Sequence, residues 1–267
     1  MPGTLAHPAY GQARPVTDQA AVIVAPNSGP MTLEGTNTWL LGAPGQQGRV
    51  LVDPGPMDEQ HAEAVIAAAG AIELILVTHR HIDHTAGIDM LAERTGAPVR
   101  ALLPEHCRDA APLGEGEALR ASGIALTVLP APGHTADSIM LAVADGAVPL
   151  LLTGDTILGR GTTVLDATDG DLGDYLDTLG AIIDDRSGHL VLPGHGPELP
   201  DAAAAASAYK AHRLHRLEEV REALRVLGED ASARDIVERV YVAVDPALWG
   251  AAESSVRAQL AYLRDRA

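Results

Sequence analysis

The sequence contains no Phe, one Lys and one Cys among its 267 residues. A single cysteine, Cys107, cannot form a disulfide within the chain, which fits a reducing compartment. The most apolar stretch, residues 62–78, is too short to span a bilayer and is interrupted by Glu63, Gly70 and Glu73. The first residues lack the basic start and apolar run of a signal peptide, so we expect a cytoplasmic protein with no membrane partner. Abundant Ala with scarce Lys and Phe indicates GC-rich coding and favours a bacterial source.

Positive charge is also scarce, and it is unevenly distributed. The formal net charge of the chain is −17. Residues 1–206 hold 9 Arg and 26 Asp or Glu, whereas residues 207–267 hold 10 Lys or Arg and 10 Asp or Glu. The acidic part should repel polyanions at long range. Contact with nucleic acid would therefore depend on bound cations and on the C-terminal segment.

Short apolar runs alternate with helical patterns over the first 200 residues. The spacing of apolar residues predicts one helix after Asp58 and Glu59, ending near residue 69, and another over residues 172–183. Alternating strands and helices of this kind predict an α/β fold in which helices cover sheets. The predicted strands are residues 21–25, 38–41, 50–52, 74–77, 99–102, 124–129, 139–143, 150–152 and 190–192.

The last part of the chain has a different, all-helical pattern. Asp201 is a predicted N-cap, and a long helix should run to Gly228. Ser232 with Asp235 resembles a capping box at the start of a short helix. A third helix should begin at the Asp-Pro pair that starts with Asp245. We therefore predict a separate helical unit at this end of the chain.

The stretch VTHRHIDHTAG, residues 77–87, gathers four side chains that bind metals: His79, His81, Asp83 and His84. A lone histidine is ordinarily structural, but this cluster directly follows a predicted strand, where sites of α/β folds are commonly built. Alternation places the first two histidines on one side of an extended chain, and the turn that follows delivers the other two ligands. Four ligands so arranged suit two adjacent metals better than one.

Three later segments share one arrangement: an apolar strand is followed by a turn with glycine and then by a residue that can bind metal. They are LPAPGHTADS with His134, LLLTGDTILG with Asp155, and LVLPGHGP with His195. Glycine lets the backbone turn sharply and approach a ligand closely. Together with the histidine cluster, these loops predict a dinuclear metal site.

These motifs resemble those of the metallo-β-lactamase-fold hydrolases: H-x-H-x-D-H, then His, Asp and His, over about residues 20–200. The resemblance implies an αββα sandwich with His79, His81 and His134 at one metal. It places Asp83, His84 and His195 at the second metal, with Asp155 as the bridge. Asp53 in LVDPG matches an acidic position that supports the ligands from behind, although a simple strand-end turn explains it equally well.

A narrower resemblance rests on NSGPMTLEGTNTWLLG, APGHTADS, GDTILGRGTTV, PGHGP and YKAHR. These segments are similar to the β-lactamase-like group that includes a mitochondrial endoribonuclease and fungal polyketide thioesterases. The resemblance implies a catalytic domain over residues 1–200 and a small winged-helix-like appendage over residues 201–267. The chain stops at LRDRA, where the wing hairpin would follow, so we expect the wing to be absent.

We therefore expect a hydrolase that uses a metal-bound hydroxide, with two Zn²⁺, or with Mn²⁺ or Fe²⁺ in their place. Asp83 and Asp155 are the candidate catalytic carboxylates. The expected substrate is a small ester or thioester, or single-stranded RNA, and no protein partner is implied.

Other readings remain open. A mononuclear non-haem iron dioxygenase of the same fold and a non-enzymatic winged-helix binding protein are the alternatives from other classes. A true β-lactamase is disfavoured by Asp155, and a glutathione-thioester hydrolase by the few cations at the C-terminus. Asn37, His212 and Arg213 are candidate substrate-binding residues. For Asn37 a plain turn is the competing interpretation. The arginines at 213, 216, 221 and 225 form either a phosphate-binding stripe or an ordinary solvated helix face, since glutamates precede two of them by three residues.

Overall fold

The computed structural model describes residues 9–166, 168–242 and 245–265, and within these residues the strands form two sheets. The first sheet has the order β1 (Arg14–Pro15), β2 (Ala20–Val24), β3 (Asn37–Leu41), β4 (Gly48–Val52), β5 (Ala71–Leu76) and β6 (Val99–Arg100). The second has the order β11 (Leu190–Pro193), β10 (Leu150–Gly154), β9 (Ile139–Val143), β8 (Ile124–Pro130) and β7 (Ala118–Ala121).

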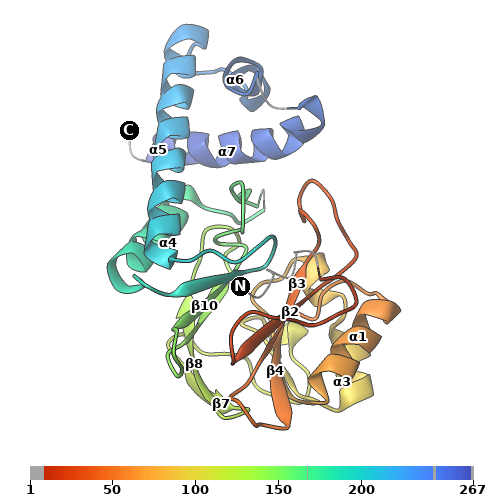
Figure 1. Ribbon diagram of the computed structural model, residues 1–267. Helices are drawn as coiled ribbons and strands as arrows, with labels where there is room; N and C mark the ends of the chain where they lie inside the picture. The colour runs from red at the N-terminus through yellow and green to blue at the C-terminus, as the bar shows by residue number, and fades with distance from the viewer. Residues whose placement is uncertain (1–8, 167, 243–244, 266–267) are drawn as a thin grey trace, which may run out of the picture.

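The two sheets pack face to face, and helices cover their outer faces (Figure 1). Helices α1 (Glu59–Ala69) and α3 (Ile88–Thr95) cover the first sheet, and α4 (Leu172–Asp185) covers the second. Strand β8 shows why the layers form: its residues alternate between buried and half-buried positions, as expected when one face meets the partner sheet. The core between the sheets includes Val22, Trp39, Leu41, Val50, Val52, Leu126, Val128, Leu141, Val143 and Leu152.

The direction of the strands brings the loops that hold the candidate metal ligands to one edge of the sandwich. Strands β4 and β5 are parallel, as are β10 and β11, whereas the other pairs in the second sheet are antiparallel. Parallel strands end at the same edge of a sheet, where sites of α/β folds are commonly built. The segments after β4, β5, β8, β10 and β11 hold every metal-ligand candidate that the sequence predicts.

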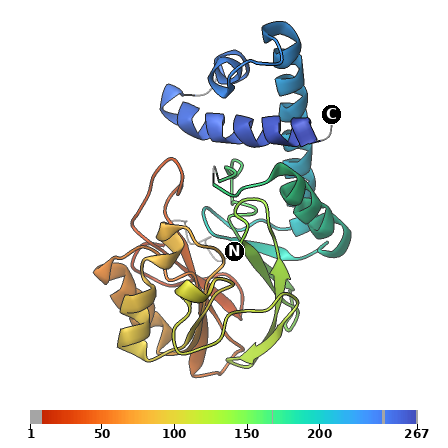
Figure 2. The same ribbon diagram turned by 180° about the vertical axis from the view of Figure 1, so that it is seen from behind.

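The C-terminal unit has a core of its own. Helix α5 (Ala202–Leu227) leaves the sandwich and packs with α6 (Ala233–Val240), η2 (Pro246–Leu248) and α7 (Trp249–Asp265). Helix α7 lies across the side of the sandwich from which the loops project (Figures 1 and 2). The described residues after β11 contain helices and no strand. Over the same described part of the chain, no helix has the length and apolar character needed to cross a membrane.

All nine predicted strands are present, and helices α5 and α6 begin at the predicted caps Asp201 and Ser232. Asp58 and Asp201 each accept a hydrogen bond from a backbone N–H at a helix start, and Ser232 with Asp235 forms the predicted capping box. Two edge strands, β1 and β7, and the short helices α2 (Ile82–Thr85) and α3 were not predicted. Strand β1 has only two residues, and α3 begins at a glycine with no side-chain cap.

Candidate metal centre

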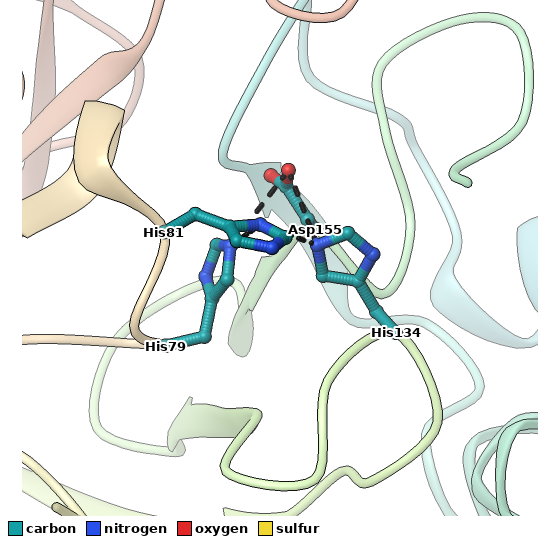
Figure 3. A group of neighbouring side chains, drawn as sticks. All are labelled: His79, His81, His134 and Asp155. Atoms are coloured by element: carbon teal, nitrogen blue, oxygen red, sulfur yellow. Dashed lines mark hydrogen bonds and ion pairs between the residues drawn. The ribbon is translucent and has the colours of Figure 1, made fainter. Parts of the chain in front are cut away.

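Four of the predicted ligands form one compact group, shown in Figure 3: His79, His81, His134 and Asp155. Their potential ligand atoms all lie within 4.8 Å of one another. Nδ1 of His81 lies 3.0 Å from Nε2 of His79 and 3.0 Å from Nε2 of His134. The three rings therefore present one nitrogen each to a common point.

The other three predicted ligands, Asp83, His84 and His195, form a second group. Nε2 of His195 lies 3.3 Å from Nε2 of His84 and 3.2 Å from Oδ2 of Asp83. Both imidazoles are buried, whereas the Asp83 side chain is 23% exposed. Asp83 and His84 belong to helix α2, and the His84 ring centre lies 4.3 Å from that of His79 in the first group.

Asp155 connects the two groups. Its Oδ2 lies 3.7 Å from Nε2 of His134 and 3.3 Å from Nε2 of His195, one histidine from each group. Its Oδ1 lies 3.5 Å from Nε2 of His84, and this buried oxygen has no hydrogen-bond partner within the described structure. A buried carboxylate oxygen without a donor is costly, so this geometry calls for a cation at the site.

Each of the five histidines is also held through its other ring nitrogen. Such contacts fix the ring and its tautomer, which is how metal-binding histidines are usually oriented. The pairs are His79 Nδ1 with Thr78 Oγ1 (3.0 Å), His81 Nε2 with Asp166 Oδ2 (2.8 Å), His84 Nδ1 with Asp53 Oδ2 (2.8 Å), His134 Nδ1 with the Val164 carbonyl (2.6 Å) and His195 Nδ1 with the Gly35 carbonyl (3.1 Å).

Asp53 stands behind the second group, as the family resemblance implies. Besides His84, its carboxylate accepts hydrogen bonds from the backbone N–H and the hydroxyl of Thr78, both at 2.8 Å. Asp53 is 1% exposed and has a φ of 59°, a conformation that non-glycine residues rarely adopt. Such a conformation in a buried acidic residue is typical of a functional position.

The pKa values of the gathered histidines are shifted in opposite directions. Burial opposes the charge on His84, but Asp53, Asp83 and Asp155 outweigh burial and raise its pKa to about 9. The pKa of His134 is instead lowered to about 4, chiefly by burial, even though Asp155 acts in the opposite direction. The negative charge is thus concentrated around the second group.

Close packing at the site depends on Gly194, which precedes His195. A Cβ atom at this position would lie 2.4 Å from Oδ1 of Asp155 and 2.8 Å from Cε1 of His84. Any side chain would therefore displace two of the gathered residues. Glycine is required here by space, not by backbone conformation.

The residues fit a pair of metal ions. A tetrahedral zinc with nitrogen ligands at about 2.0–2.1 Å holds those nitrogens about 3.3 Å apart. The nitrogen pairs of His79 with His81, His81 with His134 and His84 with His195 have separations of 3.0 to 3.3 Å. Imidazole and carboxylate ligands suit Zn²⁺, Mn²⁺ and Fe²⁺ alike.

The centre opens into a cavity of about 220 Å³. Its floor is made by His81, Asp83, His134, Asp155 and His195. Its walls are largely apolar and come from two loops: Pro30, Met31, Thr32, Leu33, Leu158, Arg160, Gly161, Thr162, Thr163 and Val164.

The three candidate substrate-binding residues lie elsewhere. Asn37 is buried, does not line this cavity, and its amide donates to the carbonyls of Pro193 and Gly196 at 2.9 Å each. It therefore joins β3 to the loop that holds His195. His212 and Arg213 line a neighbouring cavity.

Two residues of the site were not predicted from the sequence. Asp166 contacts His81, and no motif in the sequence marks it as part of the site. Thr36 donates to Oδ2 of Asp83 at 2.9 Å and is itself held by Asn27. The only sequence signal for Thr36 and Asn27 is their place in the NSGPMTLEGTNT segment.

The metallo-beta-lactamase superfamily model matches residues 31–195, the range that contains all seven gathered side chains. The chain belongs to this superfamily. The beta-lactamase associated winged helix domain matches residues 232–266. The predicted αββα fold with a winged-helix appendage is thereby confirmed.

Proteins of the narrower group are among those to which this chain is similar. A beta-lactamase-like protein 2 homolog of Drosophila melanogaster is 32% identical over 270 residues, covering 93% of this chain and 88% of the relative. An atrochrysone carboxyl ACP thioesterase of Aspergillus chevalieri is 30% identical over 194 residues, covering 71% and 60%. A hydroxyacylglutathione hydrolase of Pseudomonas putida is 40% identical over 127 residues, covering 46% and 48%. The crystal structure of a beta-lactamase domain protein from Burkholderia ambifaria superposes with a TM-score of 0.82 at 25% identity, covering 99% and 91%.

Proposed function

We propose that this superfamily member is a dinuclear metal-dependent hydrolase of acyl esters or thioesters. The observation that carries the proposal is the position of Asp155 between two groups of histidines, with Oδ2 near His134 of one group and His195 of the other. A single iron site would need only one of these groups, so the arrangement favours two metals over the dioxygenase alternative. A binding module would have no use for such a centre at the base of a cavity.

His79, His81 and His134 would hold one metal, Asp83, His84 and His195 would hold the other, and Asp155 would bridge them. When bound, two such metals lower the pKa of a water molecule to make a nucleophile and stabilise the oxyanion that develops on the electrophile. The native metal we propose is Zn²⁺, with Mn²⁺ or Fe²⁺ as the other candidates.

The protein's own groups then orient the reactants and handle the proton. The apolar walls, such as Leu33 and Leu158, exclude water and accept an acyl group. Burial acts to raise the pKa of Asp83, but the facing His84 and His195 outweigh burial and hold it below its usual range. The Asp83 carboxylate is therefore ionised and faces the cavity, where it can accept a hydrogen bond from the nucleophile and orient its proton away from the electrophile. Thr36 holds that carboxylate in place.

The charge of the site favours an acyl substrate over RNA. Besides the histidines, the one cation among the described residues of the metal cavity is Arg160, and it is paired with Glu34. On α5, three arginines that could bind phosphates form ion pairs within the helix instead. These pairs are Arg216 with Glu219, Arg221 with Glu218 and Arg225 with Glu222. These pairs support the interpretation of this helix face as an ordinary solvated surface.

Single-stranded RNA remains the competing substrate, because the narrower resemblance includes an endoribonuclease. We expect RNA binding to be weak and strongly salt-dependent. A plot of the logarithm of the binding constant against the logarithm of salt concentration should steepen by roughly 0.7 for each phosphate contact.

The test is a substrate panel after metal reconstitution: an acyl thioester, a lactone, a bis-aryl phosphodiester and single-stranded RNA, with elemental analysis of the same protein. We expect two metals per chain and turnover of the thioester or lactone. One iron per chain with oxygen uptake would overturn the proposal in favour of a dioxygenase. If only RNA is cleaved, the proposed dinuclear centre stands, but the proposed acyl substrate is overturned in favour of RNA.

A further inference from the structure

A second cavity, of about 210 Å³, lies between the catalytic loops and the appendage. It shares five lining residues with the metal cavity: Pro30, Met31, Thr162, Thr163 and Val164. Its other walls come from α5, α7 and the segment between α6 and α7. The two cavities are therefore neighbours with a common wall, and only one of them contains metal ligands.

Arg213 of α5 lies in the wall of this second cavity and is only 4% exposed. One terminal nitrogen of its guanidinium donates to the carbonyl of Thr163, and the group lies 5.2 Å from the centre of the Tyr175 ring. Its Nε is buried and has no hydrogen-bond partner within the described structure. The guanidinium is thus anchored on one side and unsatisfied on the other.

The charge of Arg213 also lacks a counter-charge. Over the described residues, no carboxylate lies within 4.0 Å of its guanidinium, although most other arginines in the chain have such a partner. None of the residues described around the cavity is Asp or Glu, in a chain whose net charge is −17. A buried charge without a partner is strongly unfavourable, so this position calls for an anion supplied from outside.

His212, the preceding residue, lines the same cavity. Its ring is half-buried, and within the described structure no side-chain hydrogen bond to it is found. Burial and the adjacent Arg213 lower its pKa, so the ring is neutral at pH 7 and has one N–H to donate. Arg213 and His212 are therefore two neighbouring donors in the wall of a cavity that is lined by no carboxylate.

The loop that anchors Arg213 also anchors a candidate metal ligand. Thr163 accepts from Arg213 through its carbonyl, and the next carbonyl, that of Val164, accepts from Nδ1 of His134 at 2.6 Å. An anion held at Arg213 would therefore occupy a fixed position relative to the metal centre. A substrate that extends over the shared wall could reach both.

We propose that this second cavity binds an anionic group of the substrate, a carboxylate or a phosphate, through Arg213 and His212. The substrate class is then an acyl ester or thioester that carries a negative charge at some distance from the bond that is cleaved. This inference rests on the proposed function for the reacting bond, but the anion site itself stands on the geometry around Arg213.

The kinetic test compares three matched thioesters: one with a terminal carboxylate, one with a terminal phosphate, and an uncharged carboxamide of the same length. We expect one of the charged substrates to have a kcat/KM about tenfold or more above that of the carboxamide, as a hydrogen bond to a charged group would give. Arg213→Gln should abolish this preference, because it should raise KM for the charged substrate about tenfold more than KM for the carboxamide. The preferred charged substrate identifies the anion.

Arg221→Gln is the control, because it removes an equal charge from the exposed part of the same helix. If Arg213→Gln and Arg221→Gln have the same substrate preference as the wild type, the anion site is overturned. If Arg213→Gln changes the cleavage of RNA but not of any thioester, the proposed acyl substrate is overturned. The cavity would then bind a phosphate of RNA.

A binding measurement separates this inference from the proposed function. Inorganic phosphate is titrated into metal-loaded wild type, Arg213→Gln, His212→Gln and Arg221→Gln, and the shift in Tm is recorded. Phosphate at the metals contributes equally to all four, so we expect a smaller shift only in the two cavity variants. Equal shifts in all four proteins overturn the anion site even if thioesters are hydrolysed. His212→Gln keeps the test valid if Arg213→Gln does not fold.

Discussion

Asp53 accepts a hydrogen bond from Nδ1 of His84 over 2.8 Å, and neither side chain is more than 1% exposed. This contact commits the Nδ1 proton of His84 to Asp53 and leaves Nε2 facing Asp83 and His195. One buried carboxylate thereby decides which nitrogen of His84 is available to a metal.

Asp53→Asn should lower metal affinity by about 10- to 100-fold, because the amide cannot hold the imidazole as the carboxylate does. Competition with a chromophoric chelator measures the affinity. Asp109→Asn is the matched control, since Asp109 is an exposed aspartate that also has a positive φ, 51°. Equal affinities in both variants would contradict a supporting role for Asp53.

Asp155→Ala should abolish turnover while the fold is retained. The carboxylate contacts both groups of histidines, and without it two cations would face each other with no shared anion. Circular dichroism should match the wild type because the apolar core does not include this side chain. Asp177→Ala, a change at an exposed position of α4, controls for loss of charge. Retained turnover in Asp155→Ala would show that Asp155 is not the bridge.

Gly194→Ala should reduce both metal content and activity. The added methyl group would meet Asp155 and His84 at distances shorter than van der Waals contact, so one of them must move. Overpacking of this kind costs about 1–3 kcal/mol, which a denaturant titration can detect. Gly250→Ala, where the structure offers open space on helix α7, should leave metal content unchanged. A full complement of metal in Gly194→Ala would contradict the steric argument.

His61 should make stability depend on pH. Burial lowers its pKa to about 4, although Asp58 partly opposes the effect, and its Nε2 lies 2.8 Å from the hydroxyl of Thr38. The unfolded chain therefore takes up a proton at His61 near pH 6.5, whereas the folded chain does not until about pH 4. The stability contributed by the neutral ring is complete above pH 6.5 and is lost as the pH falls toward 4. The full loss is about 3 kcal/mol at most.

His61→Gln cannot titrate, so it isolates this contribution. The free energy of unfolding of wild type minus that of the variant should fall between pH 7 and pH 4, as measured by urea denaturation at equal metal concentration. A difference that stays constant over this range would show that His61 is not the source.

The candidate ligands could be predicted from the sequence because three follow strands at glycine-containing turns, and the other four lie within six residues directly after a strand. Their supports could not be predicted in the same way. Asp166 reaches His81 across 85 residues, and Thr36 reaches Asp83 across 47. The carbonyls of Gly35 and Val164 carry no side-chain signature at all.

Elements with strong local signals were likewise predictable, and marginal ones were not. The capping residues Asp201 and Ser232 predict helix starts because their side chains bond the first backbone N–H groups. Strand β7 is an edge strand that is only partly buried, so its apolar pattern is weak. Its pairing with β8 is a property of the folded sheet.

Helix α5 has a consequence for how the molecule can be divided. Near its start, Ala202, Ala206 and Tyr209 pack in the outer core of the second sheet, whereas Val220 and Leu224 belong to the core of the appendage. A continuous helix of 26 residues is a stiff rod about 39 Å long, without a hinge where the two units meet. A truncation at residue 200 would strip the catalytic layers of part of their own packing. A chimera that exchanges the appendage with that of a relative should therefore be joined beyond Leu217, inside the helix.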